Sequence, residues 1–79
     1  MPDLDTLFSR RNAAAALTDA GFRTASATLA TLATRGGGPV YRRYGTRVIY
    51  RWGDLLDWAQ SRLSAPMRST ARQMGHERG

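Results

Sequence analysis

The side chains in this chain that are best suited to chemistry are its arginines. All twelve cationic residues are arginine, and six carboxylates leave a net charge of +6. Five arginines and no acid lie from Arg35 to Arg51, so one stretch of the sequence is strongly positive. A guanidinium group forms paired hydrogen bonds with phosphate oxygens and with guanine edges. This clustering favours a polyanionic partner, above all double-stranded DNA.

Residues that could support catalysis are scarce. The sequence shows no nucleophile beside a base, no carboxylate pair and no metal-ligand spacing, and its one histidine is His76. Asp54 and Asp57 are typical solvent-exposed charges near the start of a helix. The chain has no cysteine, which excludes disulfides and thiolate metal sites. We therefore expect no enzyme activity, cofactor, metal or small-molecule substrate.

The length of 79 residues allows one small domain. No apolar run approaches the roughly 20 residues of a membrane span, and the N-terminus lacks the features of a signal peptide. These observations predict a cytoplasmic, nucleoid-associated protein that does not contact membranes. We expect residues 1–7 to form a partly ordered lead, residues 8–63 the domain, and residues 64–79 a flexible basic tail.

Two short helices are predicted in the first half of the domain. Ser9 suits the N-cap of a helix over about residues 10–20, with Phe8 as a hydrophobic staple and Gly21 ending the helix. Its apolar stripe consists of small residues and one leucine: Ala13, Ala16, Leu17 and Ala20. A second helix, capped by Thr24 or Ser26, should run to about residue 34. Its buried face is predicted to be Ala25, Leu29, Leu32 and Ala33.

A glycine run and a β-hairpin follow. The run Gly36-Gly37-Gly38-Pro39 stops the helix, and it is no phosphate-binding loop because no strand precedes it and no lysine follows. Hairpin strands are predicted over residues 40–44 and 47–51, with Gly45 supplying a positive φ. We expect an apolar set to cover the helices, namely Tyr41, Tyr44, Val48 and Tyr50. Arg42, Arg43 and Arg47 should project from the hairpin.

A third helix should close the core over about residues 52–63. Its apolar stripe is Trp52, Leu55, Leu56, Ala59 and Leu63, and Trp58 widens it. Packing, rather than base stacking, is the expected role of both tryptophans. The predicted fold class is therefore α+β, a small winged helix-turn-helix with an arginine-rich wing.

This order of elements resembles the small winged-helix excisionases, which are recombination directionality factors with a MerR-like DNA-binding fold, and also the phage-type AlpA regulators. The motifs that carry the resemblance cover about residues 7–63. They are Ala13-Ala14, Thr28-Leu29, Gly36-Gly37-Gly38-Pro39, Tyr41, Arg42-Arg43, Gly45-Thr46-Arg47, Tyr50-Arg51 and Asp54-Leu55-Leu56-Asp57-Trp58. The link over residues 18–27 is longer than the family's tight turn, and the second helix lacks long polar side chains.

The resemblance implies that the second helix enters the major groove and that the hairpin reaches the backbone or the minor groove. The residues predicted to contact DNA are Arg10, Arg11, Arg23, Ser26, Thr28, Thr31, Thr34, Arg35, Arg42, Arg43, Arg47 and Arg51. Base reading should be limited to hydroxyl groups, methyl groups and the terminal arginines, which implies modest specificity. Neutralising about six phosphates would give a slope near −5 in a plot of log affinity against log salt.

The resemblance also implies the function of an excisionase. Such a protein binds and bends attachment-site DNA cooperatively with neighbouring copies of itself, and it favours excision of a mobile element by an integrase. The tail over residues 67–79 is the expected contact with the integrase or a neighbouring copy. Two alternatives stay open: a transcriptional regulator on the same fold, and a basic protein-interaction module that binds an acidic partner.

Overall fold

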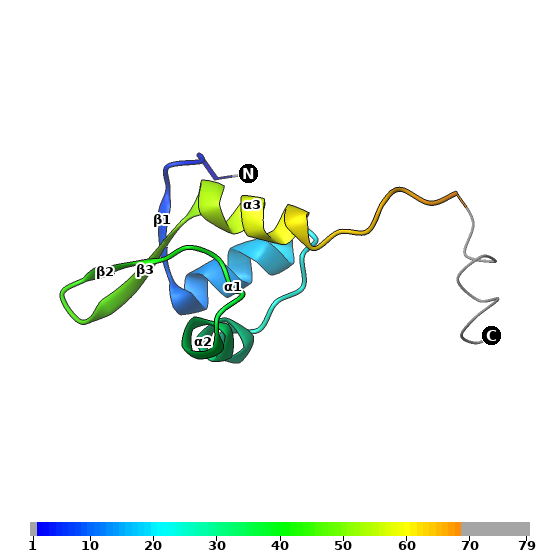
Figure 1. Ribbon diagram of the computed structural model, residues 1–79. Helices are drawn as coiled ribbons and strands as arrows, with labels where there is room; N and C mark the ends of the chain where they lie inside the picture. The colour runs from blue at the N-terminus through cyan, green and yellow to red at the C-terminus, as the bar shows by residue number, and fades with distance from the viewer. Residues whose placement is uncertain (1, 69–79) are drawn as a thin grey trace.

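The computed structural model describes residues 2–68 and has an α+β architecture. Within this range the chain forms three helices and one three-stranded antiparallel sheet of order β1-β3-β2 (Figure 1). In chain order the elements are β1 (Leu7–Ser9), α1 (Arg10–Asp19), α2 (Ser26–Arg35), β2 (Arg42–Tyr44), β3 (Arg47–Arg51) and α3 (Trp52–Ser61). Most of the predicted tail, including His76, lies outside the described residues.

The core lies where the three helices meet one face of the sheet. Its largest fully buried side chains are Trp52, Tyr50, Leu17, Leu29 and Leu55. Ala13 and Ala14 of α1 are also buried, and their small side chains allow the neighbouring elements to approach α1 closely. No helix among the described residues is long and apolar enough to cross a membrane.

Local sequence sets both ends of α1 as predicted. The Ser9 hydroxyl accepts a hydrogen bond from the backbone N–H of Asn12 at 3.2 Å, which satisfies one free amide of the first turn. At the other end Gly21 has a φ of 101°, and the N–H of Phe22 donates to the carbonyl of Leu17 at 2.8 Å. This Schellman arrangement turns the chain sharply out of the helix.

The start of α2 differs from the prediction. Ala25 is the N-cap residue, and no side chain caps the helix. Thr24 precedes the N-cap residue, and its hydroxyl donates to the carbonyl of Phe22 at 2.7 Å, closing a local turn. Ser26 is the first helical residue rather than the cap, because the preceding turn extends as far as Ala25.

The buried face of α2 is also narrower than predicted. Only Leu29 is buried; Leu32 and Ala33 are partly exposed, and Ala25 is exposed. The physical reason is that α2 makes its main helix contact with α1, and a single leucine of α2 reaches the core.

A short strand, β1, was not predicted. Phe8 lies opposite Tyr50, and β1 pairs along one edge of β3. Upstream of it, the carbonyls of Thr6 and Leu4 accept hydrogen bonds from the N–H groups of Trp52 and Gly53, at 2.8 and 2.9 Å. Since α3 has no side-chain cap, backbone carbonyls from the N-terminal segment satisfy its first amides. The lead that the sequence analysis placed before the domain therefore takes part in its packing.

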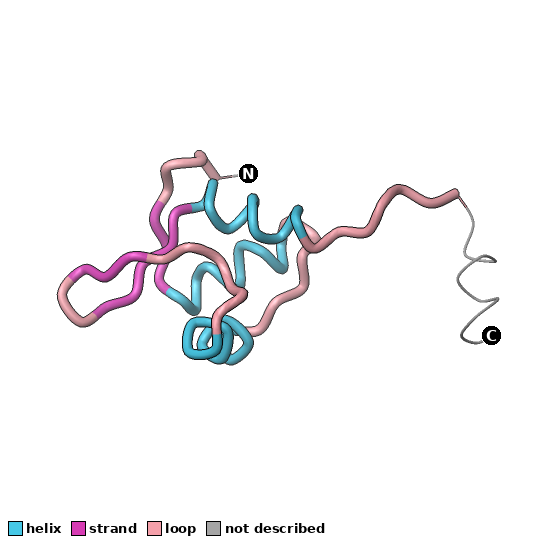
Figure 2. The backbone as a smooth tube through the Cα atoms, in the orientation of Figure 1, coloured by secondary structure: helices cyan, strands magenta, loops and turns pink. Residues whose placement is uncertain are grey.

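The hairpin projects beyond the helices (Figure 2). Residues Tyr44 and Arg47 close it around a two-residue connection, and Gly45 there has the predicted positive φ, of 65°. Tyr41 packs near Tyr50, with ring centroids 6.1 Å apart. Tyr44, in contrast, is 79% exposed, so the prediction that it covers the helices is wrong. Register explains this, because Tyr44 lies on the sheet face opposite to Val48 and Tyr50.

The third helix ends earlier than predicted. It stops at Ser61, and Leu63, expected in the core, is 63% exposed. Among its other predicted core residues, Trp52, Leu55 and Ala59 are buried as expected, whereas Leu56 and Trp58 are only partly buried. From the end of α3 to residue 68 the chain runs away from the helices and the sheet (Figure 1).

These packing differences predict unequal effects of two leucine substitutions. Leu29→Ala should lower the free energy of unfolding by about 2–5 kcal/mol, because Leu29 alone anchors α2 in the core. Leu63→Ala, at a site exposed to solvent, should change it by less than about 0.5 kcal/mol. Urea unfolding followed by circular dichroism measures both. Equal losses for the two variants would contradict the packing described above.

Candidate nucleic-acid interface

The outward face of α2 is short, hydroxyl-rich and free of acids. Its exposed residues are Ser26, Ala27, Thr28, Thr31, Thr34 and Arg35. The Thr34 hydroxyl donates back to the carbonyl of Ala30 at 3.3 Å, so its methyl group faces outward and its oxygen keeps only acceptor capacity. Small side chains such as these let the helix backbone come close to a flat or concave polyanionic surface.

The charge around α2 and the hairpin is uniformly positive. No acidic residue stands between Asp19 and Asp54, a stretch that contains α2, the glycine turn and both hairpin strands. Arg23 precedes α2 and Arg35 closes its last turn, and both are exposed. An anion that approaches this side of the molecule therefore meets no opposing carboxylate from these elements.

The glycine turn sets the hairpin relative to α2. Gly36 and Gly37 have φ values of 93° and 91°, a backbone conformation that residues with a side chain rarely adopt. A Cβ on Gly38 would lie 2.8 Å from that of Leu32, so the chain folds back against the helix it has just left. The indole N–H of Trp58 donates to the Gly37 carbonyl at 2.8 Å. A tryptophan of α3 thus fixes the turn in place.

The three free arginines of the hairpin lie on two faces. Arg43 pairs with Val48 in the register, which places Arg43 on the sheet face that also carries Tyr50 and contacts the helices. Arg42 pairs with Ile49 and Arg47 with Tyr44, which places both arginines on the opposite, outer face. All three are exposed. The sequence predicted that they project from the hairpin, but not that neighbouring Arg42 and Arg43 point to opposite sides.

Arg51 differs from the other predicted contact residues. Its guanidinium hydrogen-bonds to Asp5 at 3.1 Å and to Asp54 at 3.3 Å, and it covers Gly53 so closely that a Cβ there would meet it at 2.5 Å. The hydrogen bond to Asp5, followed by the charge of Asp54, raises the pKa of Arg51 above its ordinary value. Two carboxylates therefore compensate the charge of Arg51, which the sequence alone did not indicate.

The two arginines at the start of α1 differ in exposure. Arg10 is partly buried, and its Nε donates to the Tyr50 hydroxyl at 3.3 Å. Arg11 is exposed. One amide of the first turn of α1 is already taken by Ser9, so fewer amides are available for a phosphate than an uncapped helix would offer.

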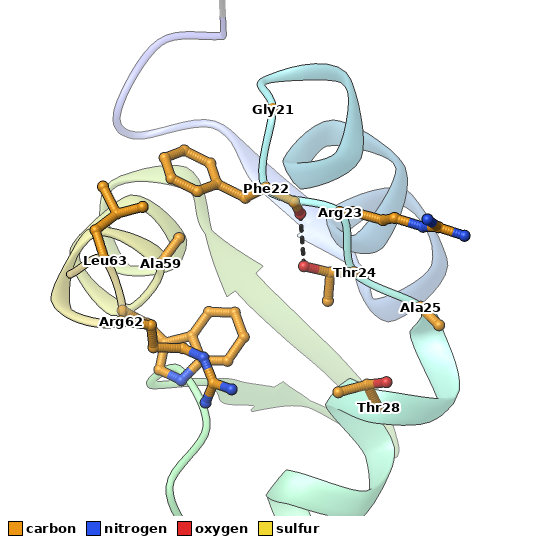
Figure 3. A pocket seen from close by; sticks show the side chains of 10 residues that line it. Gly21, Phe22, Arg23, Thr24, Ala25, Thr28, Ala59, Arg62 and Leu63 are labelled. Carbon is orange, nitrogen blue, oxygen red and sulfur yellow. Dashed lines mark hydrogen bonds between the residues drawn. The ribbon is translucent and has the colours of Figure 1, made fainter. Parts of the chain in front are cut away.

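A groove separates the start of α2 from the end of α3 (Figure 3). Phe22, Trp58 and Leu63 contribute its apolar walls, and Arg23 points away from it. The guanidinium of Arg62 lies 5.0 Å from the centre of the Trp58 ring. Arg62, which lies beside α2, was not among the residues predicted from the sequence. Its spacing of four residues from Trp58 on the predicted helix could have indicated that the two side chains are neighbours.

Comparison with known proteins adds no relative to this picture. No protein-family model matches the sequence, and no curated protein matches it significantly.

The contact between Trp58 and the glycine turn gives a second prediction. Trp58→Phe keeps a ring but removes the indole N–H, and it should cost about 1 kcal/mol of stability. It should also speed hydrogen exchange at the Gly36 amide, which donates to Leu32 at the end of α2. Arg62→Ala, the control, removes the stacked cation and keeps the hydrogen bond. Equal exchange rates in both variants would show that the indole does not hold the turn.

Proposed function

We propose that this chain is a double-stranded-DNA-binding protein of the winged helix-turn-helix type. The observation that carries the proposal is the acid-free surface formed by α2 and the hairpin, where Arg23, Arg35, Arg43 and Arg47 are exposed. Both ion pairs found among the described residues involve Arg51, at the end of β3 away from the hairpin tip. These four arginines are therefore available for phosphates, and counterion release on binding would supply affinity.

In the proposed complex α2 lies in the major groove. Thr28 and Thr31 would contact base edges through hydroxyl groups and thymine methyl groups, and Ser26 and Thr34 would lie near the strands. The hairpin would bring Arg43 and Arg47 to the backbone or to the adjacent minor groove, whose negative potential attracts arginine. Arg10 and Arg11 would add phosphate contacts. Arg47 shares the outer face with Arg42 but stands next to the two-residue connection at the hairpin tip, so it is retained. Arg42, which lies farther from the tip on that face, and Arg51, which has two carboxylate partners, are left out of the proposed interface.

The more specific function we propose is that of an excisionase. A reading face of threonine, serine and alanine offers few discriminating contacts, so a single copy would bind one site weakly. Several copies that bind side by side would supply the missing affinity, and bent DNA would favour excision by an integrase. This step rests on the resemblance to the small winged-helix excisionases, in which the recombinase performs the chemistry.

A gel-shift titration tests the function. The full chain is titrated against labelled duplexes of increasing length that cover the attachment region of the mobile element, with scrambled duplexes as the control. Successive cooperative bands on attachment DNA alone are expected. One discrete band on promoter DNA would instead indicate a transcriptional regulator. No shift at moderate salt would overturn DNA binding and indicate a protein-interaction module.

The hairpin contribution predicts a measurable change in salt dependence. Arg43→Ala and Arg47→Ala should each weaken binding to specific and scrambled duplexes alike, and each should reduce the magnitude of the salt slope by about 1. With about six phosphates neutralised, the unmodified chain should give a slope near −5. Arg68→Ala, which removes an exposed charge beyond α3, is the control. A hairpin variant that behaves like the control would remove that arginine from the interface.

A further inference from the structure

The outer face of the sheet is an apolar surface that no element covers among the described residues. Register places Leu7, Ile49 and Tyr44 on this face, one from each strand. These three residues line one shallow hollow together with Arg42, Arg43 and Arg51. Leu7 is 63% exposed and Tyr44 is 79% exposed, whereas the opposite face of the same sheet packs against the core through Phe8, Val48 and Tyr50.

Uncompensated positive charge borders this face. Arg42 and Arg47 are exposed on it, and no ion pair holds either of them within the described residues. Arg51 stands at the other end, where Asp5 and Asp54 compensate its charge. The face thus combines three apolar side chains with two free guanidinium groups, in a small domain that gains no stability from exposing them.

We propose that this outer face, centred on Leu7, Ile49 and Tyr44, binds a short acidic segment of a partner protein that also carries apolar side chains. Carboxylates of the segment would pair with Arg42 and Arg47, and its apolar side chains would cover the hollow. Tyrosine and arginine commonly supply much of the binding energy at protein–protein interfaces, and this face carries both residue types. The surface shares Arg47 with the proposed DNA interface, whereas Leu7, Ile49, Tyr44 and Arg42 are not part of that interface.

Charge and polarity select this occupant over the others. A second copy would bring the same arginines to the face and meet like-charge repulsion. A DNA backbone would pair with the arginines, yet it would leave the leucine, isoleucine and tyrosine against a charged, hydrated surface. An acidic segment with apolar residues satisfies both parts of the face.

The test uses the full chain and a synthetic peptide in which glutamate and leucine alternate. Amide chemical shifts are followed during titration in the absence of DNA, so the outcome does not depend on the proposed function. Shifts should centre on Leu7, Tyr44 and Ile49. A control peptide with glutamine in place of glutamate, and another with serine in place of leucine, should each bind about tenfold more weakly. Shifts elsewhere, or equal binding of all three peptides, would overturn the proposal.

Two matched pairs of variants sharpen the test. Arg42→Glu and Arg35→Glu alter two exposed arginines, of which only Arg42 lines the hollow, and Arg42→Glu alone should weaken peptide binding, by about fivefold. Leu7→Ser and Leu63→Ser alter two leucines that are each 63% exposed, and only the first should weaken it, by about tenfold. Thermal unfolding of each variant confirms that the domain is intact.

The same variants separate the face from DNA and lipid binding. Arg35→Glu should lower duplex affinity, whereas Arg42→Glu should retain it to within about twofold. Equal losses of duplex affinity would show that Arg42 also binds DNA and would overturn the proposal. The proposal would also be overturned if the peptide did not bind and vesicles containing anionic lipid bound through Leu7 and Arg42.

Discussion

The burial of Tyr50 and Trp52 at the junction of β3 and α3 is the constraint on which the rest of the structure depends. β3 is the central strand, so it pairs with β1 on one edge and β2 on the other, and it continues directly into α3. Phe8 meets Trp52 edge to face, with ring centroids 5.8 Å apart, and Tyr41 packs near Tyr50. β3 also contacts α1 and α3, so these two residues lie where the sheet joins those helices, and the hairpin extends from the same strand.

From this junction the two halves of the proposed DNA interface are positioned independently. The hairpin is an extension of β3, whereas α2 is held by Leu29 against α1 and by the glycine turn. Trp58, on the helix that follows β3, donates to the Gly37 carbonyl and so links the two halves. The spacing between α2 and the hairpin, which a DNA duplex would have to match, thus depends on one hydrogen bond and on close packing at Gly38.

The distribution of charge separates structural arginines from available ones. Arg51 is bound to two carboxylates and Arg10 to the Tyr50 hydroxyl, so both help to hold the sheet to neighbouring segments. Arg43 and Arg42 are adjacent in sequence, free of such partners and on opposite faces of a two-stranded ribbon. Because successive side chains of a strand point to opposite faces of the sheet, the domain carries basic residues on both faces. One basic surface lies beside hydroxyl groups and the other beside apolar side chains.

The sequence by itself determined the α+β class, the order of the helices and hairpin, the Ser9 cap, the Gly21 and Gly45 turns and the basic stretch. Each of these depends on local chemistry: a hydroxyl that caps amides, a glycine that accepts positive φ, or a period of apolar residues. Only the tertiary structure decided that Leu4 and Thr6 cap α3, that β1 exists, that Tyr44 and Leu63 are exposed, and that Arg51 is paired. The caps of α3, the pairing of β1 and the Asp5–Arg51 ion pair arise from contacts between residues some forty or more positions apart, which no local pattern encodes. The exposure of Tyr44 follows from the hairpin register, and that of Leu63 from the end of α3 at Ser61.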